Sequence, residues 1–300
     1  MDEAMDTNTI PFAVTDDDVL KVLAPERQTV PLIFSSPHSG RGYPDAFVAE
    51  SRLDPRALRR SEDSFIDELY QGAVERGAPL LCALFPRAYC DVNREPCELD
   101  PAMFTGALPQ NANTRSPRVL AGLGTIPRVV ASGSEIYAGK IPVAEAERRI
   151  AACYHPYHRR LKHLVDTTRA AFGWSLLVDC HSMPSVGGPM DRDSGLSRVD
   201  VVLGDCYGES CAPEITRTAE LAFQARGYRV VRNTPYAGGY VTRAYGRPRQ
   251  ASHALQIELN RALYMNEAEH QHGPGFEQVR ADIDRVVEAL AALAAEGKPL

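Results

Sequence analysis

Residues 174–183 have the sequence WSLLVDCHSM, an apolar run that ends in an aspartate and a histidine. Such a run predicts a buried strand whose polar end lies at the rim of a sheet, where open α/β folds place their sites. Similar runs recur in PLIFSSPHSG (31–40), in LLCALFPRAYC (80–90) before DVNR (91–94), and in ALQIELNR (254–261). This repetition predicts an α/β fold with polar groups gathered at the ends of several strands.

Along the rest of the chain, segments with the apolar spacing of a helix alternate with short apolar runs typical of strands. Helical spacing predicts helices over residues 55–76, 143–172, 213–226 and 276–295. Short apolar runs predict strands at 30–34, 79–85, 175–180, 199–203, 228–231 and 254–259. Strands that alternate with helices indicate a mixed, largely parallel sheet that helices cover on both faces.

The length of 300 residues favours a single domain over residues 1–300, with two domains of about 150 residues each as the alternative. Residues 1–28 resemble a loosely packed lead-in. Residues 97–140 lack periodicity and contain scattered Pro, Gly, Asn and Ser. A segment of this kind inside a compact domain is usually functional or mobile, and it would cover the site as a lid.

Composition excludes several classes of protein. The net charge of -6 provides no basic surface for nucleic acid, and no apolar run approaches the roughly 20 residues that span a bilayer. The acidic N-terminus lacks the features of a signal peptide, so a cytoplasmic location is expected. The seven cysteines form no CxxC pair and are expected to be reduced. Cys180 is a poor candidate nucleophile, because a strand directs it to the face opposite His181.

Two histidines at strand ends are candidate metal ligands. His181 could be a metal ligand, a general base or a hydrogen-bonded polar end, and His38 alone could belong to a simple turn. Two imidazoles with an acidic ligand and one further carboxylate are the components of a hydrolytic zinc site. The other histidines fit less well: His155, His158 and His163 on a charged helix, His270 and His272 in a polar loop, and His253 in at most a supporting role.

The carboxylates come from two other motifs. SEDSFIDEL (61–69) offers Glu62, Asp63 and Asp67, although ordinary helix capping would also explain these residues. Glu258 alternates with apolar residues, and a buried Glu in a central strand is costly without a partner. The alternative is an edge strand with a solvated face. In a central strand, Glu258 would act as the general base of a hydrolase.

Arginines next to these motifs suggest an acidic substrate. Asn93 and Arg94 stand side by side in DVNR, and Arg243 follows two glycines in GGYVTRAYGRP (238–248). The planar guanidinium suits a carboxylate, and a substrate with two carboxylates would use both arginines. Surface or helix-capping roles are the alternatives for each.

An ordered set of motifs resembles the N-formylglutamate amidohydrolase family over residues 30–265. The motifs are SPHSGRGYP (36–44), SEDSFIDELY (61–70), DVNRE (91–95), LLVDCHSMPS (176–185), GGYVTRAYGRP (238–248) and ALQIELNRALYM (254–265). The family is similar to zinc carboxypeptidases and aspartoacylase-type deacylases, which implies a zinc-carboxypeptidase-like α/β fold.

The resemblance also implies roles for particular residues. It makes His38 and His181 zinc ligands, with Asp63 preferred as the acidic ligand and Glu62 as the second choice. It assigns the catalytic role to Glu258, and substrate binding to Asn93, Arg94 and Arg243 rather than Arg247. The chain departs from the carboxypeptidase-like pattern at Arg41, which stands where those relatives carry the acidic ligand three residues after the first histidine.

These features predict a zinc amidohydrolase that cleaves the N-formyl amide of N-formyl-L-glutamate. A deacylase of other N-acyl amino acids, a carboxypeptidase and a peptidoglycan-type amidase are alternatives with the same chemistry. A non-catalytic carboxylate-binding protein is the alternative of another class. The expected partner is a small acidic N-acyl amino acid, with neither nucleic acid nor membrane, and His/Asp sites also accept manganese, cobalt or iron. The sequence leaves the oligomeric state open.

Overall fold

A computed structural model of the chain describes residues 10–11, 19–189, 191, 193–295 and 297. Its central sheet has seven strands in the described residues: β2 (Leu20–Leu23), β4 (Leu32–Ser36), β5 (Leu80–Ala83), β8 (Ser175–Met183), β9 (Val201–Gly204), β10 (Val230–Arg232) and β11 (Ser252–Asn260). They lie in the order β10-β9-β11-β8-β4-β5-β2. The pairs β11–β9 and β2–β5 are antiparallel and the other four pairs are parallel. The predicted mixed, largely parallel sheet is therefore confirmed.

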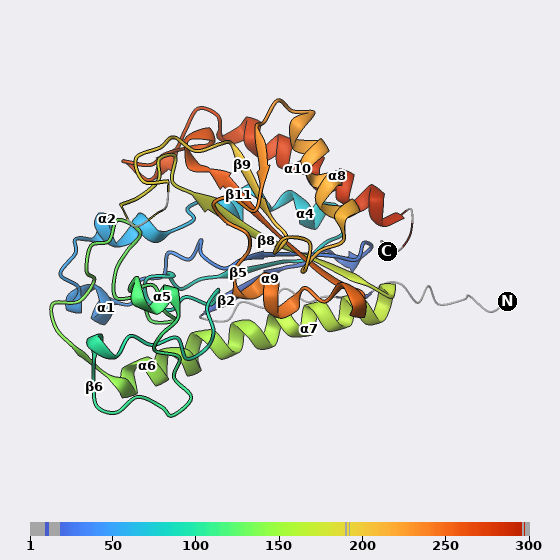
Figure 1. The fold of residues 1–300 in the computed structure, drawn as a ribbon. Coiled ribbons are helices and arrows are strands. Elements are labelled where there is room, and N and C mark those ends of the chain that lie inside the picture. Colours follow the sequence, from blue (N-terminus) through green and yellow to red (C-terminus); the bar gives the residue numbers. More distant parts are fainter. Residues whose placement is uncertain (1–9, 12–18, 190, 192, 296, 298–300) are drawn as a thin grey trace.

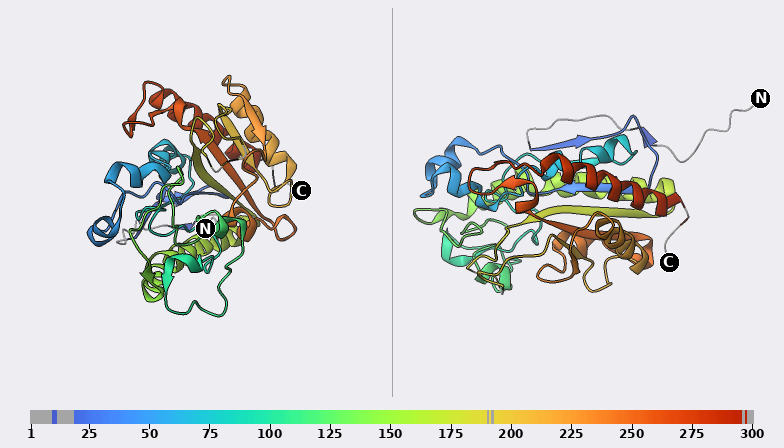
Figure 2. Two further views of the ribbon diagram at one scale, coloured as in Figure 1. Left: turned by 60° about the vertical axis from the view of Figure 1, so that its left-hand side comes forward. Right: turned by 90° about the horizontal axis from the view of Figure 1, so that it is seen from above.

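Helices cover both faces of this sheet (Figures 1 and 2). On one face lie α8 (Pro213–Gln224) and α10 (Phe276–Ala295), which pack against each other. On the other face lie α6 (Val143–Arg149), a π-helical turn (Ile150–Tyr154) and α7 (His155–Phe172). Each helical layer and its sheet face enclose a separate apolar core. No helix among the described residues combines the length and apolar character needed to cross a membrane.

The long helix predicted at 143–172 is present, with one irregularity. Its π-helical turn ends where Pro156 enters the first turn of α7. Proline has no N–H to donate to the preceding turn, which explains a local change in the hydrogen-bond ladder here. The helix ends at Gly173, whose φ of 78° is the left-handed conformation that favours glycine.

The single helix predicted over 55–76 is wrong. The structure has four short helices there: α2 (Pro55–Leu58), η1 (Arg59–Ser61), α3 (Ile66–Leu69) and α4 (Gly72–Glu75). The break at residues 62–65 has a tertiary cause, because the main-chain N–H of Asp63 donates to the carbonyl of His38 at 3.0 Å. Phe65 then adopts a left-handed φ of 68°. The apolar spacing is helical, but a contact with a distant segment fixes the backbone.

The expected lead-in is only partly observed. Residues 1–9 and 12–18 lie outside the described residues. Leu20–Leu23, however, forms the edge strand β2, with Leu20 and Val22 buried. The alternation of these two side chains with Lys21 and Leu23 is the period-2 pattern of a half-buried strand.

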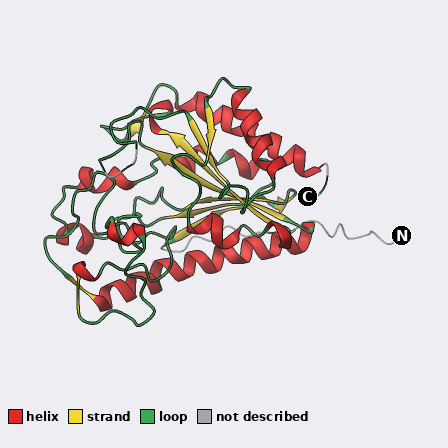
Figure 3. Ribbon diagram, in the orientation of Figure 1, coloured by secondary structure: helices red, strands yellow, loops and turns green. Residues whose placement is uncertain are grey.

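Short elements complete the described chain. They are β1 (Ile10–Pro11) with β3 (Arg27–Gln28), β6 (Phe104–Thr105) with β7 (Ile141–Pro142), β12 (Met265–Asn266) with β13 (Gln271–His272), α1 (Asp45–Glu50), α5 (Pro117–Leu120), α9 (Tyr240–Tyr245), η2 (Pro101–Met103), η4 (Pro248–Gln250) and η5 (Arg261–Leu263). Loops dominate the side of the molecule where α1, α2 and α5 lie (Figure 3). Residues 97–140 belong to this side, and apolar side chains such as Leu99, Phe104 and Ile126 anchor them in the core that α6 and α7 form with the sheet.

His158 makes a pH-dependent contribution to stability. The sequence places it on a charged helix. In the structure it is half-buried, with Nε2 2.8 Å from the carbonyl of Val92 and Nδ1 2.9 Å from the hydroxyl of Tyr245. Burial lowers the pKa of His158 from 6.5 to about 4, although the Val92 carbonyl and Asp179 oppose the shift. Between pH 6.5 and about 4 the unfolded chain binds a proton at His158 more readily than the folded protein does. The folded protein therefore has its full stability above pH 6.5 and loses this contribution as the pH falls from 6.5 towards 4.

We therefore expect His158→Gln to reduce the free energy of unfolding at neutral pH and to narrow its difference from wild type towards pH 4. The shift corresponds to a change of about 3 kcal/mol over this range. Urea unfolding of both proteins at several pH values measures the difference. Parallel stability curves would show that His158 titrates normally in the folded protein.

Candidate active site

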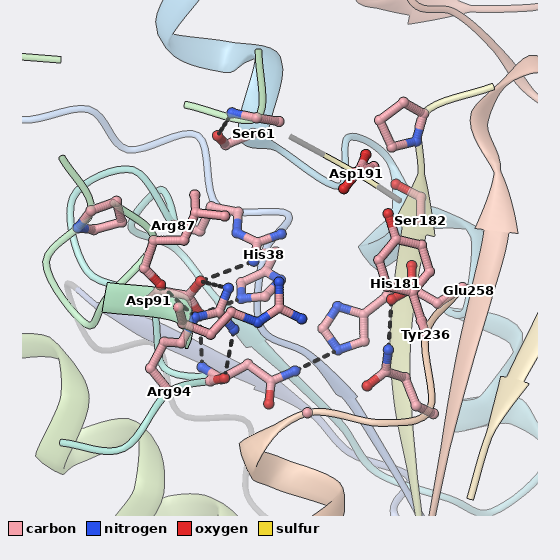
Figure 4. Close-up of a pocket in the computed structure, with 18 of the residues that line it drawn as sticks. His38, Ser61, Arg87, Asp91, Arg94, His181, Ser182, Asp191, Tyr236 and Glu258 are labelled. Carbon is pink, nitrogen blue, oxygen red and sulfur yellow. Dashed lines mark hydrogen bonds and ion pairs between the residues drawn. The ribbon is translucent and has the colours of Figure 1, made fainter. Parts of the chain in front are cut away.

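Polar side chains from four parallel strands meet at the carboxyl edge of the sheet. His38 follows β4, His181 and Glu258 lie near the ends of β8 and β11, and the loop after β5 carries Asp91. Glu258 and His181 are direct neighbours in the β11–β8 register. β11 lies between β9 and β8, so Glu258 occupies a central strand and not an edge. Figure 4 shows these side chains around one cavity.

His38, Asp63 and His181 form a buried cluster whose possible ligand atoms all lie within 4.8 Å of one another. Asp63 Oδ2 is 3.3 Å from Nδ1 of His38 and 3.1 Å from Nδ1 of His181. The other oxygen of Asp63 accepts hydrogen bonds from Arg261 at 3.0 Å and Ser182 at 3.2 Å. Two imidazole nitrogens and one carboxylate oxygen thus face a common point.

The opposite nitrogens of both rings are held by further carboxylates. Nε2 of His38 is 2.9 Å from Asp91, and Nε2 of His181 is 2.8 Å from Asp179. A carboxylate behind a histidine fixes the ring and keeps its proton on the far nitrogen, which leaves the near nitrogen free to bind a metal. In agreement, Nδ1 of His38 is buried and makes no hydrogen bond within the described part of the chain.

The charge balance of the cluster also suits a cation. Burial opposes ionisation of Asp63, but contacts with His181 and His38 hold its pKa well below the usual range. Burial likewise lowers the pKa of His181, yet Asp179 and Asp63 outweigh it and raise this pKa well above normal. The carboxylates around the two imidazole rings therefore favour a positive charge at the centre of the cluster. A divalent metal would supply that charge, and the residues present fit one.

Glu62 is committed elsewhere. Its carboxylate pairs with Arg59 at 2.9 Å, and it accepts hydrogen bonds from Tyr43 at 2.8 Å and Ser64 at 2.9 Å. The break in the expected helix turns Asp63 and not Glu62 to the histidines. Of the two acidic candidates, the structure brings only Asp63 into the cluster.

Glu258 lies in the cavity wall with its side chain almost completely buried. Burial raises the pKa of Glu258 to about 7, although His181 and Arg87 partly oppose the shift. One carboxylate oxygen, Oε1, accepts a hydrogen bond from Gln256 at 2.6 Å. A carboxylate with a pKa near neutrality can both accept and release a proton at physiological pH.

Comparison with known proteins identifies the family. The sequence profile described as N-formylglutamate amidohydrolase matches residues 30–265. This chain belongs to the N-formylglutamate amidohydrolase family. The family expected from the sequence motifs is confirmed.

Individual members of the N-formylglutamate amidohydrolase family are similar to this chain over most of their length. A protein of Pseudomonas aeruginosa named N-formylglutamate deformylase is 35% identical, with 91% of this chain and 97% of the relative covered. One of Pseudomonas putida with the same name is 32% identical, with 83% and 87% covered. The crystal structure of N-formylglutamate amidohydrolase from Ralstonia eutropha JMP134 has a TM-score of 0.86 and 33% identity, covering 93% of this chain and 99% of that one.

In this member of the N-formylglutamate amidohydrolase family, Asn93 and Arg94 line the cavity, and both also form hydrogen bonds with other residues of the chain. Asn93 accepts a hydrogen bond from the N–H of Val241 at 2.8 Å and donates to Asp179 at 3.3 Å. Arg94 donates to the carbonyls of Leu123 at 2.7 Å and Asn93 at 2.8 Å. Both residues are therefore fixed in place, and Asn93 in addition orients the carboxylate behind His181.

The structure does not bring Arg243 to the cavity. It is exposed on α9, whose buried residues are Val241 and Thr242, and it is not among the residues that line the cavity. Gly239, one of the two glycines before it in the sequence, lies against the side chain of Asn93.

Sequence reasoning missed several residues that the fold places in this site. Asp91 and Asp179 hold the histidines; both belong to quoted motifs, DVNR (91–94) and LLVDCHSMPS (176–185), but neither was given a role from the sequence. Arg87 pairs with Asp91 at 2.9 Å and Arg261 with Asp63 at 3.0 Å. Arg87 lies in the apolar run LLCALFPRAYC (80–90), and Arg261 directly follows strand β11. A charged side chain buried in such a place requires a partner. That signal could have identified them.

Proposed function

We propose that this chain hydrolyses N-formyl-L-glutamate to formate and glutamate, with a divalent metal held by His38, Asp63 and His181. The observation that carries the proposal is that both histidines of this cluster line the same cavity as Glu258. The names of the two Pseudomonas relatives support the substrate. Two histidines and one carboxylate, with a position left for water, are a typical catalytic zinc set, so we propose zinc.

The bound metal would polarise the amide carbonyl and lower the pKa of a water molecule. The chain's own residues supply the proton transfers. Gln256 holds Oε1 of Glu258, which leaves Oε2 to take a proton from the attacking water and return it to the amide nitrogen. Breaking the C–N bond then releases formate and the amino group of glutamate.

The α-carboxylate of the substrate requires a cationic partner close to the reacting amide. Arg94 and Arg87 lie beside Asp91, which is in turn bonded to His38, so both arginines are near the cluster (Figure 4). We assign them, with the Asn93 amide, to this carboxylate. The cavity volume of about 170 Å³ is below the range of sites for drug-sized ligands, which favours a small substrate.

We expect purified, zinc-loaded protein to release formate from N-formyl-L-glutamate, and chelation to abolish the release until zinc is restored. N-acetyl- and N-succinyl-L-glutamate should be poorer substrates, because the acyl group must fit beside Glu258. Formate release is measured by a coupled dehydrogenase assay. A folded, zinc-loaded sample that hydrolyses only the larger acyl groups would exclude the proposed substrate and retain the class of reaction. Release that survives complete metal removal would exclude the metal.

A further inference from the structure

The cavity wall carries one arginine, Arg118, that has no ion-pair partner among the residues that the structure describes. Four arginines line the cavity, and Arg261 pairs with Asp63 at 3.0 Å. Arg87 and Arg94 share Asp91, at 2.9 and 3.3 Å respectively. The fourth, Arg118, makes no hydrogen bond or ion pair through its guanidinium with any residue that the structure describes.

The acidic groups of the cavity are already used by other partners. Asp191 pairs with Arg198 at 2.6 Å and accepts a hydrogen bond from the N–H of Gly188 at 2.9 Å. Glu258 accepts its hydrogen bond from Gln256. Among the described residues no carboxylate contacts Arg118, and the four arginines of the wall outnumber its three carboxylates, Asp91, Asp191 and Glu258.

Arg118 also lies close enough to Arg94 to repel it. Burial lowers the pKa of Arg94 to about 10, and the positive charges of Arg118 and Arg87 add to this effect against the attraction of Asp91. Neighbouring guanidinium groups that share one carboxylate are unfavourable unless a further anion joins them. The arrangement is therefore suited to an anionic ligand.

The backbone that carries Arg118 is firmly placed. α5 is capped by Ser116, which accepts a hydrogen bond from the N–H of Val119, and the Val119 side chain is buried. The carbonyl of Arg118 accepts a hydrogen bond from Leu123 at 2.8 Å, and the carbonyl of Leu123 accepts one from Arg94 at 2.7 Å. The main chain of Leu123 thus connects Arg118 and Arg94 through hydrogen bonds, and this connection fixes the position of α5 relative to the cavity.

We infer that Arg118 binds the distal carboxylate of the substrate and so selects N-acyl derivatives of dicarboxylic amino acids. This inference rests on the proposed function. Arg87 and Arg94 lie next to the carboxylate that holds His38, which suits the α-carboxylate adjoining the amide. Arg118 is exposed at the edge of the cavity, where the end of a glutamate side chain would emerge.

The inference is tested with Arg118→Gln on two substrates of the same shape, N-formyl-L-glutamate and N-formyl-L-glutamine. Loss of a charged hydrogen-bond partner should lower kcat/KM for the glutamate derivative by about 10- to 100-fold, mainly through KM. The glutamine derivative has no distal charge, so its kcat/KM should be the same for variant and wild type. Arg115→Gln removes the same charge from an exposed residue of the same segment outside the cavity wall, and it should change neither value.

Two results would overturn the inference while leaving the proposed function intact: equal losses on both substrates, or no loss on either. If the wild-type protein releases no formate at all, the proposed function fails. Calorimetric titration with glutarate and pentanoate then decides the inference separately. Weaker glutarate binding by Arg118→Gln, with pentanoate unaffected, would support Arg118 as the distal site, and unchanged glutarate binding would reject it.

Discussion

Replacing Glu258 with Gln is expected to lower kcat for N-formyl-L-glutamate by about 10²- to 10⁴-fold. The amide has nearly the same shape as the carboxylate, but it cannot take the proton of the attacking water. Glu258 is not a member of the His38–Asp63–His181 cluster, so the variant should bind as much metal as the wild type. The measurements are steady-state kinetics and metal content of the same preparation.

A loss of activity through unfolding is readily distinguished. Burial already raises the pKa of Glu258 to about 7, which shows that the fold disfavours its charge. The neutral Gln should therefore leave the melting temperature unchanged or raise it. Glu62→Gln is a matched control, because Glu62 is a buried glutamate outside the cavity wall, and its kcat should be that of the wild type. Near-normal turnover of Glu258→Gln would remove this residue from the mechanism.

The sheet and three residues of the candidate site could be predicted from the sequence for a local reason. His38, His181 and Glu258 lie at or near the ends of apolar runs, and such runs become central strands wherever a buried sheet forms. Parallel strands bring these ends to one edge without any further information. The alternation of strands and helices therefore determined both the fold class and the position of the site.

The remaining site residues depend on tertiary contacts that have no local pattern. Asp63 faces the histidines because its backbone N–H bonds to His38, and this contact breaks a segment with helical spacing. Arg118 reaches the cavity from the irregular segment at 97–140, in which periodicity provides no guide to direction. Conversely, Arg243 has a favourable sequence context, but α9 presents it to solvent.

The choice between the two adjacent acids can be tested directly through metal content. Asp63→Asn removes a negative ligand from between two histidine nitrogens, at 3.1 and 3.3 Å, and keeps the side-chain volume. Loss of a partner that only supports a ligand typically weakens metal binding by about 10- to 100-fold, so loss of the ligand itself should cost at least about 100-fold. Activity should fall with metal content and should not recover fully at saturating zinc.

Glu62→Gln provides the matched control, one residue away and equally buried. It weakens the pair with Arg59 and the hydrogen bond from Tyr43, so it should reduce the free energy of unfolding by about 1–3 kcal/mol. Its metal content should remain that of the wild type, because its carboxylate does not face the histidines. The opposite pattern, with metal lost from Glu62→Gln and retained in Asp63→Asn, would show that residues 62–65 adopt another conformation when the metal binds.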